Sequence, residues 1–494
     1  MADLRVAKWN RRYRLGGDAR SDRARIDRVL SAAVDDSLLS AAIERAGIPS
    51  TEELCIRSVA SFVRLDRSEP DSRIAVAWSV ALADAIARRV REGGPDVVRF
   101  ASRHQALANM ACCVARGELD RSWAWRQLGL WHTADFVPSA ASHGEVIDAL
   151  VREARAAPAV LAVVARAGLL RSLSLNVPAE RWTTLARAAL IAFDSDRSLL
   201  RALAIDGDSG HDVSSPADAG HIIARVTHRS AILAAVVKDR RADMTTARAF
   251  VALAILECEP GLVCSSVTEI VVRELSAFVA ANAERQATDA RIAKRATAAR
   301  SASEVGAPRK PEIEPSAMDN GVVGDDRPRY TTAFGGLVFL LHAVRALDLP
   351  TVVSVDPVLA SRSLRWTLHG LALILAPLDA TDAAALAFCG LAPNMQPPSQ
   401  GELPTTDAER STLGGLADAI RAWIREYGVA LPDENDDSLL RGVTSRRAEV
   451  VADPAWIELR FALGDATTEV RRAGLDLDLG WVPWLGVVVR FVYE

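Results

Sequence analysis

Residues 456–494 decide how this chain is read, and they spell WIELRFALGDATTEVRRAGLDLDLGWVPWLGVVVRFVYE. Apolar residues alternate with other residues over 457–463, 475–479 and 487–493. A period of two places every second side chain on the same face of a strand, so the pattern predicts three β-strands. Between the last two lies GWVPWLG at 480–486, whose proline and bounding glycines predict a rigid apolar turn.

Two N-terminal segments, 4–15 and 53–66, also alternate and predict strands. The C-terminal strands need partners, because an isolated hairpin is at best marginally stable in water. We therefore predict that N- and C-terminal strands join in one small antiparallel or mixed sheet.

The remaining sequence favours helices, since it is rich in Ala and Leu and its apolar residues recur three or four positions apart. The predicted fold class is mainly α with α+β terminal parts, in which multi-helix bundles accompany the small sheet. Segment 309–329, RKPEIEPSAMDNGVVGDDRPR, lacks an apolar stripe and predicts a disordered linker. The predicted domains are an α+β domain at 1–132, a helical domain at 133–283, a linker at 284–329, a helical domain at 330–450 and a β segment at 451–494.

Composition bounds the class of protein. The 494 residues are 50% hydrophobic and 25% charged, which fits a globular chain with room for several domains. Fifty-nine basic residues against 63 acidic ones give a net charge of −4, which argues against a general nucleic-acid binder. The six cysteines form no CxxC pair and have no zinc-finger spacing, so we expect buried free thiols in a reducing compartment. The sequence shows no signal core and no apolar run of about 20 residues, so we expect a cytoplasmic protein.

Candidate catalytic and metal-binding patterns are weak. Residues 207–210, GDSG, match the tetrapeptide around a serine-protease nucleophile, but His211 follows where that family has glycine, and the segment lies between predicted helices. His211, His221 and His228 lie in one region, and two imidazoles can bind zinc, although structural zinc prefers four ligands. We expect ordinary helix or boundary histidines here. The sequence predicts no catalytic residue, no metal and no cofactor.

Two stretches resemble a known group of proteins. FGGLVFLLH at 334–342 and RAGLDLDLGWVPWLG at 472–486 are similar to uncharacterised proteins of bacterial contractile-injection-system loci and to the contractile injection system tape-measure family. Residues 46–49, AGIP, and 52–56, EELCI, fit the same group. The resemblance implies a non-enzymatic structural or assembly component of an extracellular, phage-tail-like particle.

The resemblance also implies partners and contact residues. The expected partners are tube, sheath or baseplate proteins or an associated ATPase, with no nucleic acid and no membrane span. The expected protein-interaction residues are Trp481, Pro483, Trp484, Leu485, Gly335 and Gly336. Tape measures are usually long continuous helices, whereas this chain is punctuated, so an accessory, chaperone or baseplate-associated role stays open beside the tape-measure role. The chain could also leave the cytoplasm later, within a released particle.

Two other functions remain open at this point. One is a metal-dependent hydrolase that uses the His211, His221 and His228 region. The other is a regulatory scaffold unrelated to injection systems. The sequence also leaves open whether the turn with Trp481 and Trp484 is an interface or part of the core, and the core is favoured because exposed paired Trp promotes aggregation.

Overall fold

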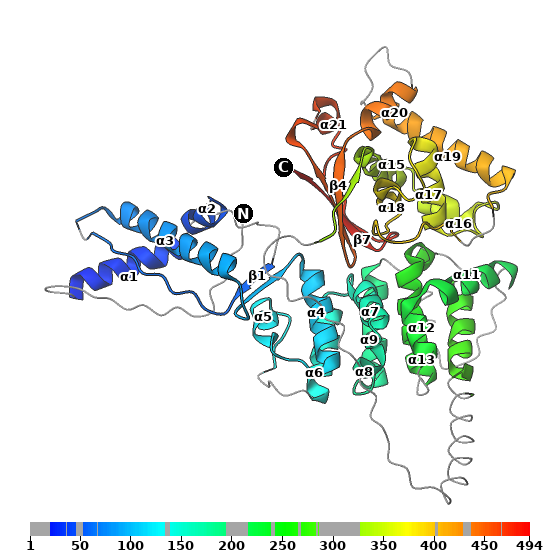
Figure 1. The fold of residues 1–494 in the computed structure, drawn as a ribbon. Coiled ribbons are helices and arrows are strands. Elements are labelled where there is room, and N and C mark those ends of the chain that lie inside the picture. The colour runs from blue at the N-terminus through cyan, green and yellow to red at the C-terminus, as the bar shows by residue number, and fades with distance from the viewer. Residues whose placement is uncertain are drawn as a thin grey trace, which may run out of the picture. The chain divides into compact units, whose positions relative to one another are not determined.

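A computed structural model shows a mainly helical chain with a small two-stranded sheet near the N-terminus and a five-stranded mixed sheet near the C-terminus (Figure 1). The chain divides into two compact units, the first within residues 1–106 and 119–137 and the second within 107–118, 138–308 and 327–494. The structure describes residues 20–35, 37–45, 53–66, 68–133, 139–193, 216–238, 243–264, 268–282, 285, 327–400, 404–427, 436–465 and 467–494.

The first unit contains a three-helix cluster made by α1 (Arg20–Asp35), α2 (Ser37–Arg45) and α3 (Asp71–Glu92). Each helix contributes one apolar stripe to a shared core that includes Leu39 and Trp78. The same unit holds the antiparallel strands β1 (Glu53–Ile56) and β2 (Val97–Phe100), and α5 (Ser122–Gln127). The chain passes from the first unit to the second within α4 (Arg103–Arg116).

The strand predicted at 53–66 ends early, at Ile56. Its partner β2 has only four residues, and the ladder stops after the Arg57 amide donates to the Asp96 carbonyl at 2.9 Å. β1 and β2 pair with each other and not with the C-terminal strands, so the predicted common sheet is wrong for them. The strand predicted at 4–15 lies outside the described residues.

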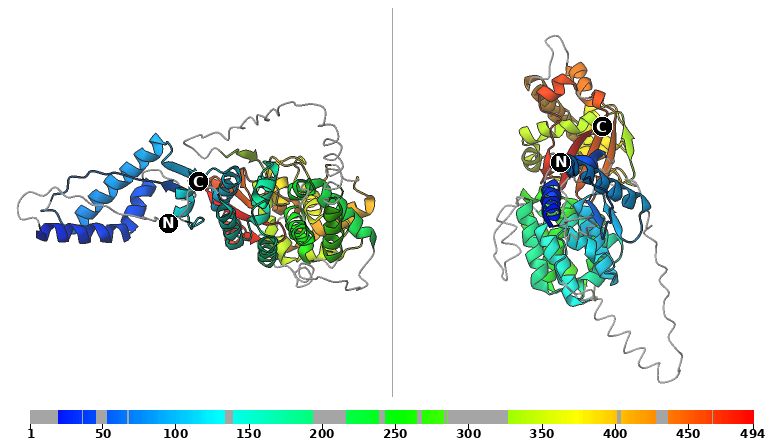
Figure 2. Two further views of the ribbon diagram at one scale, coloured as in Figure 1. Left: turned by 90° about the horizontal axis from the view of Figure 1, so that it is seen from below. Right: turned by 90° about the vertical axis from the view of Figure 1, so that its left-hand side faces the viewer.

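The second unit begins with a layer of helices that lie side by side (Figure 2). α13 is buried on every face and packs against α7, α9, α11 and α12, which explains why its sequence shows no polar side. These helices confirm the predicted helical character of this part of the chain. The layer consists of α6 (Ala140–Arg152), α7 (Ala157–Arg166), α8 (Leu170–Ser174), α9 (Ala179–Ala192), α11 (Pro216–Arg229), α12 (Ala231–Val237), α13 (Met244–Cys258), η1 (Pro260–Cys264) and a helix over 268–282.

The rest of the second unit, residues 327–494, packs helices on a sheet with strand order β3-β4-β5-β7-β6. All neighbours are antiparallel except β5 and β7, which are parallel. The strands are β3 (Tyr330–Thr332), β4 (Ala448–Asp453), β5 (Trp456–Phe461), β6 (Gly480–Val482) and β7 (Val487–Tyr493). The helices are η2 (Gly335–Leu340), α15 (Leu341–Ala346), α16 (Leu349–Val355), α17 (Leu364–Leu375), α18 (Ala383–Phe388), α19 (Asp407–Glu426), α20 (Asp436–Thr444), η3 (Leu463–Asp465) and α21 (Thr468–Arg472).

Two of the three predicted C-terminal strands are confirmed as β5 and β7, and the third is wrong. Residues 473–476 form a turn in which Gly474 has a left-handed backbone with φ of 67°, and 477–479 have no regular structure. In place of a strand partner, the Asp478 carboxylate lies beside β7 and accepts a hydrogen bond from the Phe491 amide at 2.7 Å. The strand partners that the sequence reading missed are β3 and β4, which complete the sheet beside β5.

Gly335 and Gly336 lie where the chain enters the core of this half. Because glycine has no Cβ, both positions let another part of the chain come close. A Cβ on Gly336 would overlap the Val443 carbonyl oxygen, and one on Gly335 would overlap the Ala448 side chain. The Gly335 amide also donates to the Arg446 carbonyl at 2.7 Å.

We expect Gly336→Ala to lower the free energy of unfolding by about 2–4 kcal/mol, because its methyl group must displace a backbone carbonyl. Thermal unfolding followed by circular dichroism measures the change. Gly415→Ala is the matched control: this site, inside α19, is open, and the substitution should stabilise the protein by about 0.5–1 kcal/mol. Equal melting of the two variants would contradict the close approach at Gly336.

Candidate functional site

The turn predicted to bind other proteins docks on the helical layer of its own chain. The Trp481 indole N–H donates to the Ala192 carbonyl at 3.1 Å, at the end of α9. Its ring meets Phe193 edge-on, with 4.9 Å between ring centroids and 87° between planes. Gly486, with φ of 71°, closes the turn against Phe193 and Pro260, where a side chain has little room.

Arg365 of α17 fastens this turn to the end of α13. Its guanidinium donates to the carbonyls of Glu257 and Cys258 and to the carbonyl of Leu485, each at 3.1 Å. The last carbonyls of a helix have no partner within the helix, and they carry a partial negative charge that favours a cation. One side chain therefore caps α13 and holds the turn in place.

The predicted interaction residues thus have roles within the chain. Leu485 is fully buried in the core of residues 337–491, and Gly335 and Gly336 are buried as well. Trp481, Pro483 and Trp484 are partly buried. Their binding to another protein stays a prediction.

We expect Arg365→Met to destabilise the second unit by about 2–4 kcal/mol, because it leaves three carbonyls without a donor. Urea unfolding followed by tryptophan fluorescence measures this. Arg410→Met, which removes an exposed pair with Asp407, should cost less than about 1 kcal/mol. A loss at Arg365 no larger than the loss at Arg410 would argue against its role as a fastener.

The candidate metal region is only partly described. His221 and His228 are exposed on α11, and His211 lies outside the described residues. Among the described residues, no group of three or more His, Cys, Asp or Glu side chains is placed to hold a metal ion.

Five cysteines are free and buried, which confirms the prediction of buried thiols for Cys55, Cys112, Cys113, Cys258 and Cys389. The side chain of Cys264 lies outside the described residues. Burial raises the pKa of Cys389 to about 12, and burial together with Glu53 raises the pKa of Cys55 to about 12. Because the thiolate is the nucleophile, these two thiols are unreactive in the folded protein.

We expect Cys55 and Cys389 to resist alkylation by iodoacetamide at pH 8 in the native protein, since about one thiol in 10⁴ is ionised at a pKa near 12. Both should react within minutes once the chain is unfolded in guanidinium. Mass spectrometry of the labelled peptides reports each site, with the unfolded sample as the control. Rapid native labelling of Cys389 would show that the surrounding core opens readily.

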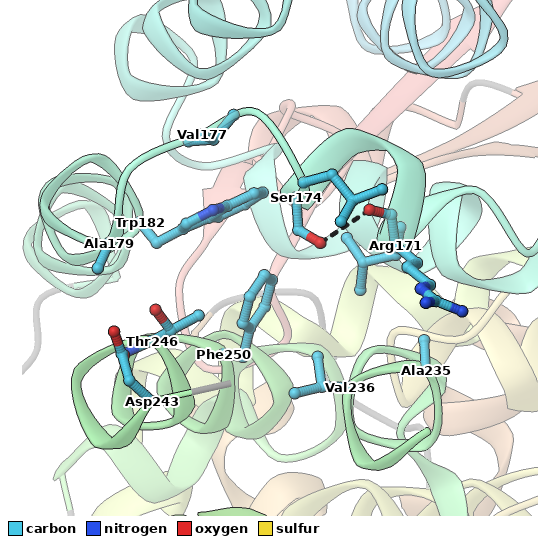
Figure 3. Close-up of a pocket in the computed structure, with 12 residues that line it drawn as sticks. Arg171, Ser174, Val177, Ala179, Trp182, Ala235, Val236, Asp243, Thr246 and Phe250 are labelled. Carbon is cyan, nitrogen blue, oxygen red and sulfur yellow. Dashed lines mark hydrogen bonds between the residues drawn. The ribbon is translucent and has the colours of Figure 1, made fainter. Parts of the chain in front are cut away.

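A pocket of about 220 Å³ opens between α8, α9, α12 and α13 (Figure 3). The rings of Trp182 and Phe250 lie in contact, 4.6 Å apart between centroids, and form its apolar part. Leu175 lies at its edge and is 49% exposed. An engineered apolar cavity of about 150 Å³ holds benzene, so this pocket has room for one aromatic or branched aliphatic side chain.

Two polar groups that line the pocket are held by local hydrogen bonds, whereas the buried Trp182 indole N–H has no partner in the residues that the structure describes. The Ser174 hydroxyl donates to the Arg171 carbonyl at 2.9 Å, and the Asp243 carboxylate accepts the Thr246 amide at 2.7 Å and caps α13 (Figure 3). The exposed side chains of Arg171 and Asp243 leave one charge of each sign beside the pocket. This arrangement suits binding of an apolar group, with charges around it to select the ligand.

Sequence reasoning did not find this pocket. Trp182 and Phe250 stand on two helices that are distant in sequence, and each alone reads as an ordinary core residue. Only the packing of α9 against α13 brings the rings together.

In the described part of the chain, no single helix is long and apolar enough to cross a bilayer. One bent pair of helices, Gly335–Ala346 with Leu349–Val355, is long and apolar enough when the two are taken together.

Comparison with known proteins gives no relative: no family model matches the chain, and no curated protein or solved structure is significantly similar to it.

Proposed function

We propose that this chain is a non-enzymatic structural or assembly component of a contractile injection system, and that it acts by binding other proteins of the particle. The observation that carries the binding role is the pocket between α8, α9, α12 and α13, with its paired rings and exposed Leu175. The link to injection systems rests on the resemblance of 334–342 and 472–486.

The contacts of these two stretches fit such a role. Both lie in the second unit, where Gly336 meets the Val443 carbonyl and the 480–486 turn meets α9. Such contacts hold the helices and the small sheet of this unit in a rigid arrangement. A rigid body that offers a pocket with an apolar part can bind a partner without a large loss of conformational entropy.

The buried acidic groups near the turn also have structural roles. The Glu257 carboxylate accepts the Ser230 hydroxyl at 2.6 Å and the Ala231 and Ile232 amides, and thereby caps α12. Burial raises the pKa of Glu257, and these hydrogen bonds oppose that rise. Glu259 pairs with Arg225 at 3.3 Å, and Arg225 also donates to the Ser361 carbonyl. Glu257 thus acts within the helical layer, whereas Arg225 joins that layer to the C-terminal half.

The test is co-expression of the chain with tube, sheath and baseplate proteins encoded beside its gene, followed by affinity purification and measurement of binding. We expect at least one of these proteins to co-purify. Ala235→Trp, which fills the pocket, should weaken that binding roughly tenfold or more, as loss of a central anchor does.

Ala234→Trp is the matched control, because Ala234 is exposed on the same helix and does not line the pocket. It should leave binding unchanged, and both variants should melt close to the wild-type protein. Absence of any tail-like gene beside this one, together with no binding to such proteins, would overturn the proposal. Equal binding by both variants would show that the partner does not bind at the pocket.

A further inference from the structure

The exposed face of α3 in the first unit carries a line of residues with the spacing along which two helices can pair, which we call the seam. Arg73, Ala77, Val80 and Asp84 follow one another at spacings of four, three and four, which places them in line along one side of the helix. All four are exposed, whereas Ile74, Trp78 and Ile86 on the other side are buried in the three-helix core. α3 is 22 residues long, so the seam lies on a well-formed helix (Figure 1).

We propose that two copies of this chain associate through their α3 helices, packed antiparallel about a two-fold axis. If Ala77 of one copy lies opposite Val80 of the other, the pairing is centred between positions 78 and 79. Positions 73 and 84 share that centre, so Arg73 then lies opposite Asp84. The two-fold axis repeats both pairs, which gives two small-to-large contacts and two ion pairs in one interface.

Charge selects this orientation. In a parallel pair with the same seam, Arg73 would lie opposite Arg73 and Asp84 opposite Asp84, and both contacts would be repulsive. In the antiparallel pair all these charges are matched. Arg73 is available for such a contact, because its side chain is 75% exposed and its partner in the monomer, Glu69, is a neighbour on the surface.

Two apolar residues flank the seam and would be covered by the same association. The Ser61 hydroxyl donates to the Ala81 carbonyl at 3.2 Å, which holds its segment beside α3, and the next residue, Phe62, is 97% exposed. Val76 is 43% exposed on the other flank. A two-fold axis places equivalent residues on the same side, so the two Phe62 rings lie on one flank and the two Val76 side chains on the other.

The interface is small, so the dimer should be weak and concentration-dependent. Sedimentation velocity of the full-length protein from about 1 µM to about 100 µM covers the range expected for such a contact. We expect a monomer–dimer equilibrium in the wild-type protein. Val80→Glu should raise the dissociation constant at least about tenfold, because it places a charge in the seam. Arg28→Glu, an exposed charge reversal on α1, should leave the dissociation constant unchanged.

A charge swap tests the register. Arg73→Glu and Asp84→Arg should each weaken self-association, because each places like charges opposite one another in both symmetric contacts. An equimolar mixture of the two variants should form a heterodimer, and the double variant should regain self-association. Thermal unfolding checks that each variant is folded. A wild-type protein that stays monomeric throughout, a Val80→Glu protein that associates like the wild type, or a mixture that does not associate would overturn the proposal.

Discussion

The second unit depends on hydrogen bonds to a few carbonyls where its helical layer meets residues 327–494. α13 ends at Cys258, and its last carbonyls point toward the C-terminal half. Arg365 binds them and the Leu485 carbonyl together. An unpaired buried carbonyl costs about 1–3 kcal/mol, so the end of the helix and the turn hold each other in place. Arg225 and Arg229 make contacts of the same kind, with the carbonyls of Ser361 and Pro398.

This constraint explains the presence of Trp481 and Gly486 in the 480–486 turn. Trp481 supplies both a ring for Phe193 and a donor for the Ala192 carbonyl. Gly486 permits a left-handed backbone close to Pro260. The turn, for which the sequence favoured the core over an interface, packs against α9 of its own chain. Two further surfaces that we propose for partners lie elsewhere, at the pocket beside Trp182 and on the outward face of α3.

These two surfaces differ in what they can bind. The pocket beside Trp182 has the size of one side chain and suits an anchor residue of another protein. The α3 face is a helical stripe whose charges match its own reversed copy, and it suits self-association. A chain with one surface of each kind can join copies of itself and hold a different protein, as assembly components do.

The sequence by itself determined the mainly helical class, the strands β5 and β7, the glycine-bounded turn and the burial of the thiols. Each follows from a local rule: periodicity, turn chemistry, or the preference of free cysteine for the core. Only the tertiary structure decided which strands pair, because pairing depends on which partner is near in the fold. β1 pairs with β2, while β5 pairs with β4 and β7. Asp478 binds the Phe491 amide where a strand was predicted. The pocket and the Arg365 contacts also bring together residues far apart in sequence, and the exposure of Val80 depends on where the other helices pack. No local sequence pattern encodes these spatial relations.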